Sequence, residues 1–497
     1  MELTESPVAR PIGRRTRRDP HPRFLPDLTD QLDAVAGCPQ LQVPAEHPAR
    51  GVQRLVEQFD TGLIESRYSS LGRHGHRPKR LLAVWVYASL QGLHRASEVA
   101  RACKTDAAFR LLSGGHSISD ATLKRFRAGN QALFEQAIER TVELAHEQQL
   151  LALDQLATDS MRLRAHASRS AIGTLSRSSQ RLEQLAKQES SSLNQDDKLK
   201  RQRSMQRHQL VLERCQALGR QSVVLSNELA ALMKFPGGGS APGHRVTVTA
   251  AGASNRLVVG VLVDADPTDR GKLPSAILQT LEALQRAGVE ETALLRLAAD
   301  AGYWDATSLK FALQMQPRID VLVAEAKVGP KPGHEQFLGR ERFALSPDER
   351  TVLCPEGRLM QGPESAGKGK RRWWGVGCCT CTLKPQCTGA PRRKFEVVLG
   401  YEAARNHMRE RLAATGAKQQ YAKRAAIIEP VFSSLQSTMK FHRASSRHAP
   451  TIVAEVLLKL LAHNVARLLT AHRRRLSVVW LQLHAHHWTL SPAKNLF

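Results

Sequence analysis

The sequence has no apolar segment long enough to cross a membrane. A span needs a run of about 18 uncharged apolar residues, and none occurs in the 497 residues. The N-terminal stretch MELTESPVARPIGRRTRRDP also lacks the apolar core of a signal peptide. These absences exclude a membrane-spanning protein and argue against secretion. We therefore expect an intracellular protein without a membrane partner.

Acidic residues are few compared with basic ones. The chain has 46 Asp and Glu against 72 Lys and Arg, which gives a formal net charge of +26. An excess of this size predicts a polyanionic partner, and nucleic acid is the favoured one. Cysteines are also few, and five of the eight lie between Cys354 and Cys387. This clustering in a large chain is unlike a secreted disulfide framework and indicates reduced thiols or a metal site.

The length is that of roughly three domains. Apolar periodicity predicts a mostly helical N-terminal half, with a dense buried helix over 81–93. A later polar segment predicts a two-helix insertion, which is either a basic arm along DNA or a solvated spacer. The expected organisation is a flexible basic arm (1–35), a helical domain (36–140), a main domain (150–470) that is interrupted by a helical insertion (168–235) and a cysteine-bearing insertion (345–395), and a basic tail (471–497).

A short basic helix is predicted in the segment SISDATLKRFRAGN. Ser119 or Asp120 is its expected N-cap. Lys124, Arg125 and Arg127 would then lie on its exposed side. A capped basic helix that follows a buried one suits helix-turn-helix docking on DNA. The solvated face of a helical bundle explains the same pattern equally well.

The main domain is predicted to be a mixed α/β sheet. The segments VTVTAAG and NRLVVGVLVDAD have the composition of strands, 273–287 is an amphipathic helix, and LLRLAAD is a third strand. Asp159 and Asp300 each follow an apolar stretch, and we place both at strand ends, where open sheets hold their sites. Glu429 precedes Pro430, which is typical of a helix start. An ordinary turn Asp and a dipole-stabilising Glu are the competing interpretations.

These three acids suit one chemistry. Carboxylates that hold two divalent ions activate a water or 3′-hydroxyl and stabilise the leaving oxygen of a phosphodiester. Mg²⁺ prefers such oxygen ligands. Arg424, Lys440 and Arg443 would bind DNA phosphates or offset developing charge. The neighbouring acids are predicted to have loop and capping roles: Asp264, Asp266, Asp269 and Asp305.

A second metal is predicted less specifically. Cys378 and Cys381 form a C-x₂-C pair, and Cys354 and Cys387 would complete a tetrahedral four-thiolate zinc site. The other spacings are loose, so a zinc site and free thiols stay equal alternatives.

Several segments together resemble bacterial insertion-sequence transposases of the DDE type. PAEHPARGVQRLVEQFD and the stretch from Tyr68 to Arg127 are similar to the N-terminal domain of that family. TDSMRLRAHAS, ADAGYWD and YAKRAAIIEPVFSSLQSTMKFHRASSR are similar to its three catalytic blocks, in the same order. The resemblance implies a helical domain for DNA binding and assembly, followed by an RNase H-like catalytic domain. It places the catalytic and metal-binding acids at Asp159, Asp300 and Glu429, with two Mg²⁺ or Mn²⁺ ions.

The resemblance also implies a function. The protein would bind the terminal inverted repeats of its element, cleave phosphodiester bonds and join 3′-hydroxyl ends to target DNA, as a homodimer in the bacterial cytoplasm at the nucleoid. Tyr421 and Arg424 match the family's tyrosine and arginine before the glutamate. Gln436 departs from the lysine often found seven residues after it, and Lys440 is a candidate substitute. The alternatives are an inactive DNA-binding relic or regulator, and a metal-dependent nuclease without strand transfer.

Overall fold

The computed structural model describes residues 23–33, 37–69, 73–187, 194–290, 293–326, 337–367 and 369–488, with side chains up to residue 475. The chain forms two compact units, one within Met1–Tyr87 and Ala96–Phe126 and the other within Ala88–Arg95 and Arg127–Phe497. Among the described residues, no helix has both the length and the apolar character that crossing a membrane requires.

The first unit is helical, as the sequence predicts. The apolar stretch near residue 81 forms α4, and its residues from Leu81 to Ala88 are buried. Trp85 donates its indole N–H to the carbonyl of Leu123 at 3.2 Å, which ties α4 to α7. Ser119 is the expected cap, since its Oγ accepts a bond from the Thr122 N–H. The helices that start in this region are α1 (Pro39–Gln42), α2 (Pro48–Val56), α3 (Gly62–Glu65), α4 (Pro78–Leu90), α5 (Ala96–Thr105), α6 (Ala107–Leu112) and α7 (Asp120–Gly129).

The described part of the predicted flexible arm (1–35) is bound to the helical unit. Residues 1–22 of that arm lie outside the described part of the chain. The N–H groups of Leu25 and Leu28 bond to the carbonyls of Gly75 (2.9 Å) and Gly114 (3.0 Å). Asp27 forms an ion pair with Arg80 of α4. These bonds hold residues 25–28 against the helical unit, so this stretch is part of the unit and not of an arm.

The second unit contains a mixed sheet. Its strands are β1 (Leu156–Arg164), β5 (Ser240–Ala251), β6 (Leu257–Asp264), β7 (Leu295–Ala299) and β8 (Ile319–Val323), with the short β4 (Ala231–Lys234) beside one end of β5. The order across the sheet is β6-β5-β1-β7-β8. β5 is antiparallel to β1 and β6, whereas β1, β7 and β8 are parallel. The sheet is therefore mixed, as the sequence predicts, with three antiparallel strands followed by two parallel ones.

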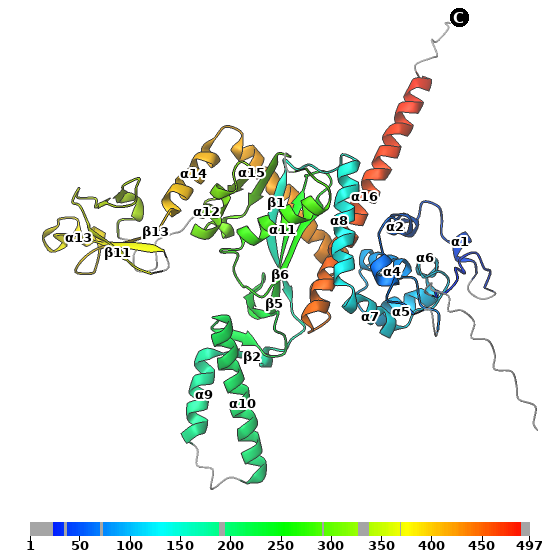
Figure 1. Cartoon of the computed structure of the whole chain (residues 1–497), viewed down its shortest axis with the longest axis horizontal. Coiled ribbons are helices and arrows are strands. Elements are labelled where there is room, and N and C mark those ends of the chain that lie inside the picture. Colours follow the sequence, from blue (N-terminus) through cyan, green and yellow to red (C-terminus); the bar gives the residue numbers. More distant parts are fainter. Residues whose placement is uncertain are drawn as a thin grey trace, which may run out of the picture. The chain divides into compact units, whose positions relative to one another are not determined.

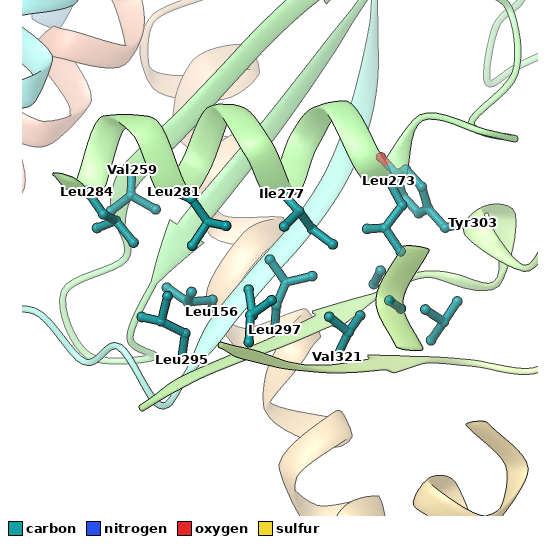
Figure 2. Close-up of a cluster of buried hydrophobic side chains, with 14 of the residues drawn as sticks. Leu156, Val259, Leu273, Ile277, Leu281, Leu284, Leu295, Leu297, Tyr303 and Val321 are labelled. Carbon is teal, nitrogen blue, oxygen red and sulfur yellow. The ribbon is translucent and has the colours of Figure 1, made fainter. Parts of the chain in front are cut away.

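Helix α11 (Leu273–Arg286) covers one face of this sheet with a continuous apolar stripe. Figure 2 shows side chains of the helix directed toward the strand residues Leu156, Leu295, Leu297 and Val321; they are Leu273, Ile277, Leu281 and Leu284. Side chains alternate between the two faces of a strand. Asp159 is three residues from Leu156 and Asp300 is three from Leu297. Both acids therefore belong to the face opposite α11.

Helix α15 (Ala417–Ser433) packs on β1, β5 and β7. The following π-helical turn (Ser434–Thr438) leads to α16 (Ala449–Trp488), which packs on β6 and on α8 (Gln131–Glu147). Buried Asn464 of α16 bonds to both the N–H and the carbonyl of Val258, each at 2.8 Å. The predicted basic tail at 471 is wrong in its boundary, because α16 continues to Trp488; residues 489–497 lie outside the described part.

Two insertions interrupt the sheet domain (Figure 1). Helices α9 (Leu175–Lys187) and α10 (Gln195–Leu218) stand side by side on a small ribbon of β2 (Ile172–Thr174) and β3 (Ser222–Val224). The second insertion has its own core around Trp373 and Phe395. Its main elements are β9 (Ala344–Leu345), β10 (Val352–Leu353), β11 (Gln361–Ser365), β12 (Lys370–Trp374), α13 (Lys384–Cys387) and β13 (Lys394–Val398). Helices α12 (Ala306–Gln314) and α14 (Tyr401–Ala413) pack on each other and on β8.

Candidate active site

The sheet brings Asp159 and Asp300 together. β1 and β7 run parallel, with Thr158 opposite Ala299. The residue that follows each of these two is one of the acids, Asp159 or Asp300. Neighbouring strands lie about 4.8 Å apart. Asp300 follows the end of β7, as predicted. Asp159 is in the middle of β1 and not at its end, which corrects the sequence prediction.

The alternating burial of the residues after Asp159 explains why β1 continues past it. Met161 and Leu163 are buried, and Arg162 and Arg164 alternate with them, so the segment taken for a basic turn has the two-residue period of a strand. Beyond Thr158, β1 pairs only with β5 among its neighbours in the sheet, because β7 has ended. Asp159 therefore lies where one neighbour of its strand stops, and its side chain is 24% exposed.

Arg424 of α15 contacts both acids. Its Nη1 lies 2.8 Å from Asp159 Oδ2, and its Nη2 lies 3.6 Å from Asp300 Oδ1. The Arg424 side chain is only 14% exposed, whereas that of Asp300 is 47% exposed. One guanidinium thus bridges two carboxylates that would otherwise repel each other.

The electrostatics of the pair follow from burial and charge. Burial raises the pKa of Asp159 above its ordinary value, although the Ser160 N–H and the charge of Arg424 act in the opposite direction. Burial alone would lower the pKa of Arg424, but the carboxylate of Asp159 raises it. The Tyr421 ring centroid is 5.9 Å from the Arg424 Cζ, and burial raises the pKa of its phenol. The guanidinium therefore stays charged between the two acids.

A second charged network lies next to Asp159. It includes Asp264 and Asp269, for which the sequence predicts only loop and capping roles. Ser160 Oγ donates to Asp269 at 2.5 Å. Arg245, 2% exposed, pairs with Asp264 at 2.6 Å and with Asp269 at 3.4 Å. The predicted capping role of Asp305 is correct, because it accepts the first N–H groups of α12. Nothing in the sequence places Asp269 beside β1, since that contact comes from the fold.

Glu429 does not start a helix. It lies well inside α15 and is exposed, and Pro430 is an internal residue of the same helix. A proline inside a helix removes the N–H that would bond the carbonyl four residues earlier, here that of Ala426. Arg256 Nε supplies the missing donor at 3.0 Å. This compensation lets the helix continue through the proline.

The three predicted acids are thus only partly assembled. Asp159 and Asp300 share Arg424, while Glu429 follows Arg424 by five residues on the same helix. In the part of the chain that the structure describes, no group of three or more His, Cys, Asp or Glu side chains is arranged to hold a metal ion.

The predicted DNA-binding cations have different environments. Lys440 and Arg443 are exposed on the segment after the π-helical turn, which contains Gln436. That segment is bound to β1, because the Arg164 N–H donates to the His442 carbonyl at 3.2 Å and the Ala444 N–H donates to the Arg164 carbonyl at 2.9 Å. Lys440 and Arg443 are therefore anchored to the strand that holds Asp159.

On α7, Lys124 and Arg125 are exposed, and Lys124 pairs with Asp120 at 2.8 Å. Arg127 is only 7% exposed, which corrects its assignment as a DNA contact. It donates to Ser445 Oγ at 3.0 Å and lies 3.7 Å from the buried carboxylate of Glu455. Its positive charge therefore interacts with groups inside the second unit.

The four cysteines proposed as zinc ligands line one small pocket. The pocket lies in the second insertion, and Arg358 and Arg393 also line it; the four cysteines are Cys354, Cys378, Cys381 and Cys387. Cys379 is exposed and does not line the pocket. The four thiols that the spacing selects therefore line one pocket without Cys379, but in this structure their side chains are not arranged as a metal-ligand set.

Two family models match the chain. Residues 353–469 match a family described as "Transposase DDE domain". Residues 38–129 match "Transposase domain (DUF772)". The first match includes Glu429 and Arg424, and the second covers α1 to α7. No curated protein matches the chain.

Among solved structures, one entitled "Mos1 transposase paired-end complex with left transposon end" is similar at 11% sequence identity. The alignment covers 82% of this chain and 96% of that chain, with a TM-score of 0.17. A TM-score of 0.17 supports no inference about fold or partners, so the two family matches carry the comparison.

Proposed function

We propose, on the premise that this chain is a transposase of the DDE type, that it binds the ends of an insertion sequence and cleaves phosphodiester bonds there. It then joins the resulting 3′-hydroxyl ends to target DNA. The observation that carries this proposal is the convergence of Asp159 and Asp300 on the single guanidinium of Arg424. Two carboxylates that already share one cationic group form a donor set for a divalent cation.

Mg²⁺ or Mn²⁺ is the proposed partner of these acids. Carboxylate oxygens are the ligands these ions prefer, and Asp159 and Asp300 supply them from adjacent strands. Two bound ions would lower the pKa of a water or 3′-hydroxyl and offset charge on the leaving oxygen. Glu429 is proposed as the third acid, supplied from α15.

The protein's own groups orient the reaction. The Ser160 N–H bonds to Asp159 Oδ1 at 2.7 Å and fixes that carboxylate on β1. Arg424 neutralises the acid pair in the free protein and is positioned to bind a DNA phosphate once the acids have another cation. Lys440 and Arg443, with Tyr421, would hold the DNA backbone beside β1. Lys124 and Arg125 on α7 would contact DNA independently of that site.

Double-stranded DNA is the proposed partner, both as terminal repeats and as target. Because two ends must be held together, a homodimer is the proposed working form, in the bacterial cytoplasm at the nucleoid. A nuclease without strand transfer would use the same acids. The exposed position of Glu429 and the neutral Gln436 favour the other alternative, an inactive DNA-binding relic.

The test is Mg²⁺-dependent cleavage of duplex DNA that carries the repeats flanking the gene, with a second duplex as acceptor. We expect cleavage that leaves 3′-hydroxyl ends and joins them to the acceptor. Cleavage without joining would replace the transposase with a nuclease. Tight binding of the repeats with no cleavage under Mg²⁺ or Mn²⁺ would support the relic.

We also propose that the four pocket cysteines hold a structural zinc ion. Four thiolates are a usual closed ligand set for Zn²⁺, and such ions stabilise small domains with little core of their own. Purified protein should contain about one equivalent of zinc by elemental analysis. Cys381→Ser should release it and lower the melting temperature of the insertion, whereas Cys379→Ser should do neither. Stoichiometric zinc in both variants, or metal-free protein with a normally folded insertion, would contradict the site.

A further inference from the structure

The helical insertion contains a basic groove at its base. The groove lies between α9, α10, strand β2 and the short turn before β2. Four arginines and one histidine line it, and no Asp or Glu does: Arg169, Arg177, Arg181, Arg207 and His208. All four arginines are exposed. The hairpin therefore presents a concentrated positive charge that the proposed catalytic site does not use.

The groove is built by specific packing. Gly173 of β2 allows Val211 of α10 to approach closely, because a Cβ on residue 173 would lie 2.3 Å from a Val211 methyl carbon. Buried Ser178 of α9 bonds through its Oγ to His208 Nδ1 of α10 at 3.0 Å. The first contact packs α10 closely on β2, and the second joins α9 to α10 at the base of the hairpin. The arginines are thereby held around a fixed hollow.

The charge of the groove is not balanced locally. Within the described residues, none of its four arginines has an ion pair with a carboxylate. Arg181 bonds to the neutral amide of Gln184 at 3.1 Å, and Arg207 bonds to the carbonyl of Ser170. Both bonds leave most of the five guanidinium donors free for a ligand. Positive charge on Arg207, Arg181 and Arg177 helps to lower the pKa of His208, after the larger effect of burial.

Another hollow of the chain differs from the groove, because its basic side chains have acidic partners. The large hollow of the first unit has Arg77, Lys79 and Arg80 in its wall, but also Asp27, Glu57, Asp60 and Glu65. Lys79 and Arg80 are paired there with Glu57 and Asp27. Basic groups in that hollow are neutralised by the fold, whereas those of the insertion are left for an external anion.

We infer that the groove between α9 and α10 binds the sugar-phosphate backbone of duplex DNA. The inference rests on the proposed function, which supplies the DNA, and it adds a contact surface that the catalytic residues do not provide. Arg177 and Arg181 are one helical turn apart on α9, so their side chains lie on one face with a rise of about 6 Å. Arg207 of α10 and Arg169 of the turn before β2 line the same groove. Guanidinium groups in such an array match consecutive phosphates and read no base sequence.

The test compares DNA affinity for two charge-matched double variants of the full chain. Arg177→Gln with Arg181→Gln removes two positive charges from the groove. Lys198→Gln with Arg203→Gln removes two exposed charges from α10 outside it. Arg177→Lys with Arg181→Lys keeps the charge and checks that the groove still folds. Fluorescence anisotropy with a labelled 30-base-pair duplex would give the dissociation constant between 50 and 300 mM salt, for terminal-repeat and unrelated sequences.

We expect the groove variant to bind both duplexes about tenfold more weakly near 150 mM salt. A plot of the logarithm of the binding constant against the logarithm of the salt concentration should also become less steep, by about two units. The reason is that each lost phosphate contact lowers the slope by close to one unit. The outer-charge variant should stay within about twofold of wild type, and the lysine variant should retain most of the affinity. Equal weakening by groove and outer variants would reduce the effect to net charge and overturn the inference. Unchanged binding by the groove variant would overturn it while leaving the proposed function intact. If wild-type protein binds no duplex, both fail.

Discussion

Asp300→Asn is expected to abolish DNA cleavage while leaving DNA affinity within about twofold of wild type. Asparagine keeps the volume of the side chain but removes the charge that a divalent cation requires. The rate should fall by about 10³-fold or more, at the upper end of what loss of one electrostatic group in an active site costs. Asp159→Asn should have the same effect, because both carboxylates share Arg424. Single-turnover cleavage of the terminal-repeat duplex and anisotropy with the same duplex measure the two quantities.

A matched control lies five residues along the chain. Asp305 caps α12 through the N–H groups of Thr307 and Ser308, and its other oxygen accepts from the Gly271 N–H at 2.8 Å; within the described residues it has no bond to Asp159, Asp300 or Arg424. Asparagine caps a helix about as well as aspartate. Asp305→Asn should therefore cleave at close to the wild-type rate. Wild-type cleavage by Asp300→Asn would remove that residue from the site, and loss of cleavage by both variants together with weaker folding would indicate a structural cause.

The sheet and its first acid pair could be predicted from local sequence. LLRLAA is an apolar run that ends at Asp300, and a strand that ends in an acid is a local signal. For β1, the same signal selects Asp159, which the fold does place beside Asp300, but the local reason is incomplete. The apolar stretch before Asp159 predicts a strand and the arginines after it predict a turn, whereas the buried Met161 and Leu163 continue the strand. Asp159 is partly exposed where the neighbouring strand β7 ends, which a single segment does not reveal.

The prediction that Glu429 lies at a helix start is wrong for a different physical reason. Proline after an acid usually marks a helix start, since an internal proline leaves one carbonyl without a donor. Here the donor comes from Arg256, 170 residues away in the sequence. A local pattern cannot contain that compensation. The cysteine segment shows the opposite case, because spacing alone selected the four thiols that line one pocket.

Arg127 shows why a basic helix is not always a DNA contact. Its helix has the pattern of an exposed cationic face, yet its guanidinium lies in the interior. There it donates to the carbonyl of His94 at 3.0 Å and to Ser445 Oγ, while Glu455, 1% exposed, accepts from the Ser445 N–H at 2.9 Å. Lys459 on the next turn of α16 donates to the Leu93 carbonyl, and burial lowers the pKa of Lys459 to about 7. This buried network connects α16, the segment after the π-helical turn, and residues 93–94.

Glu455→Ala is therefore expected to be the most destabilising single substitution proposed, with a loss of about 3–5 kcal/mol in the free energy of unfolding, because it leaves a buried guanidinium without its counter-ion. Guanidinium denaturation of the full chain measures this loss. The control Glu410→Ala, at an exposed position on α14, should change the free energy of unfolding by less than about 0.5 kcal/mol.

Arg127 and Glu455 share one network, so their substitutions should not be additive. The double variant Arg127→Ala with Glu455→Ala should lose about 0.5–3 kcal/mol less stability than the sum of the two single variants. Strict additivity would show that the 3.7 Å pair contributes no coupling and that Glu455 acts only as the acceptor for Ser445. Restoration of stability by Glu455→Gln, which keeps that acceptor but not the charge, would lead to the same conclusion.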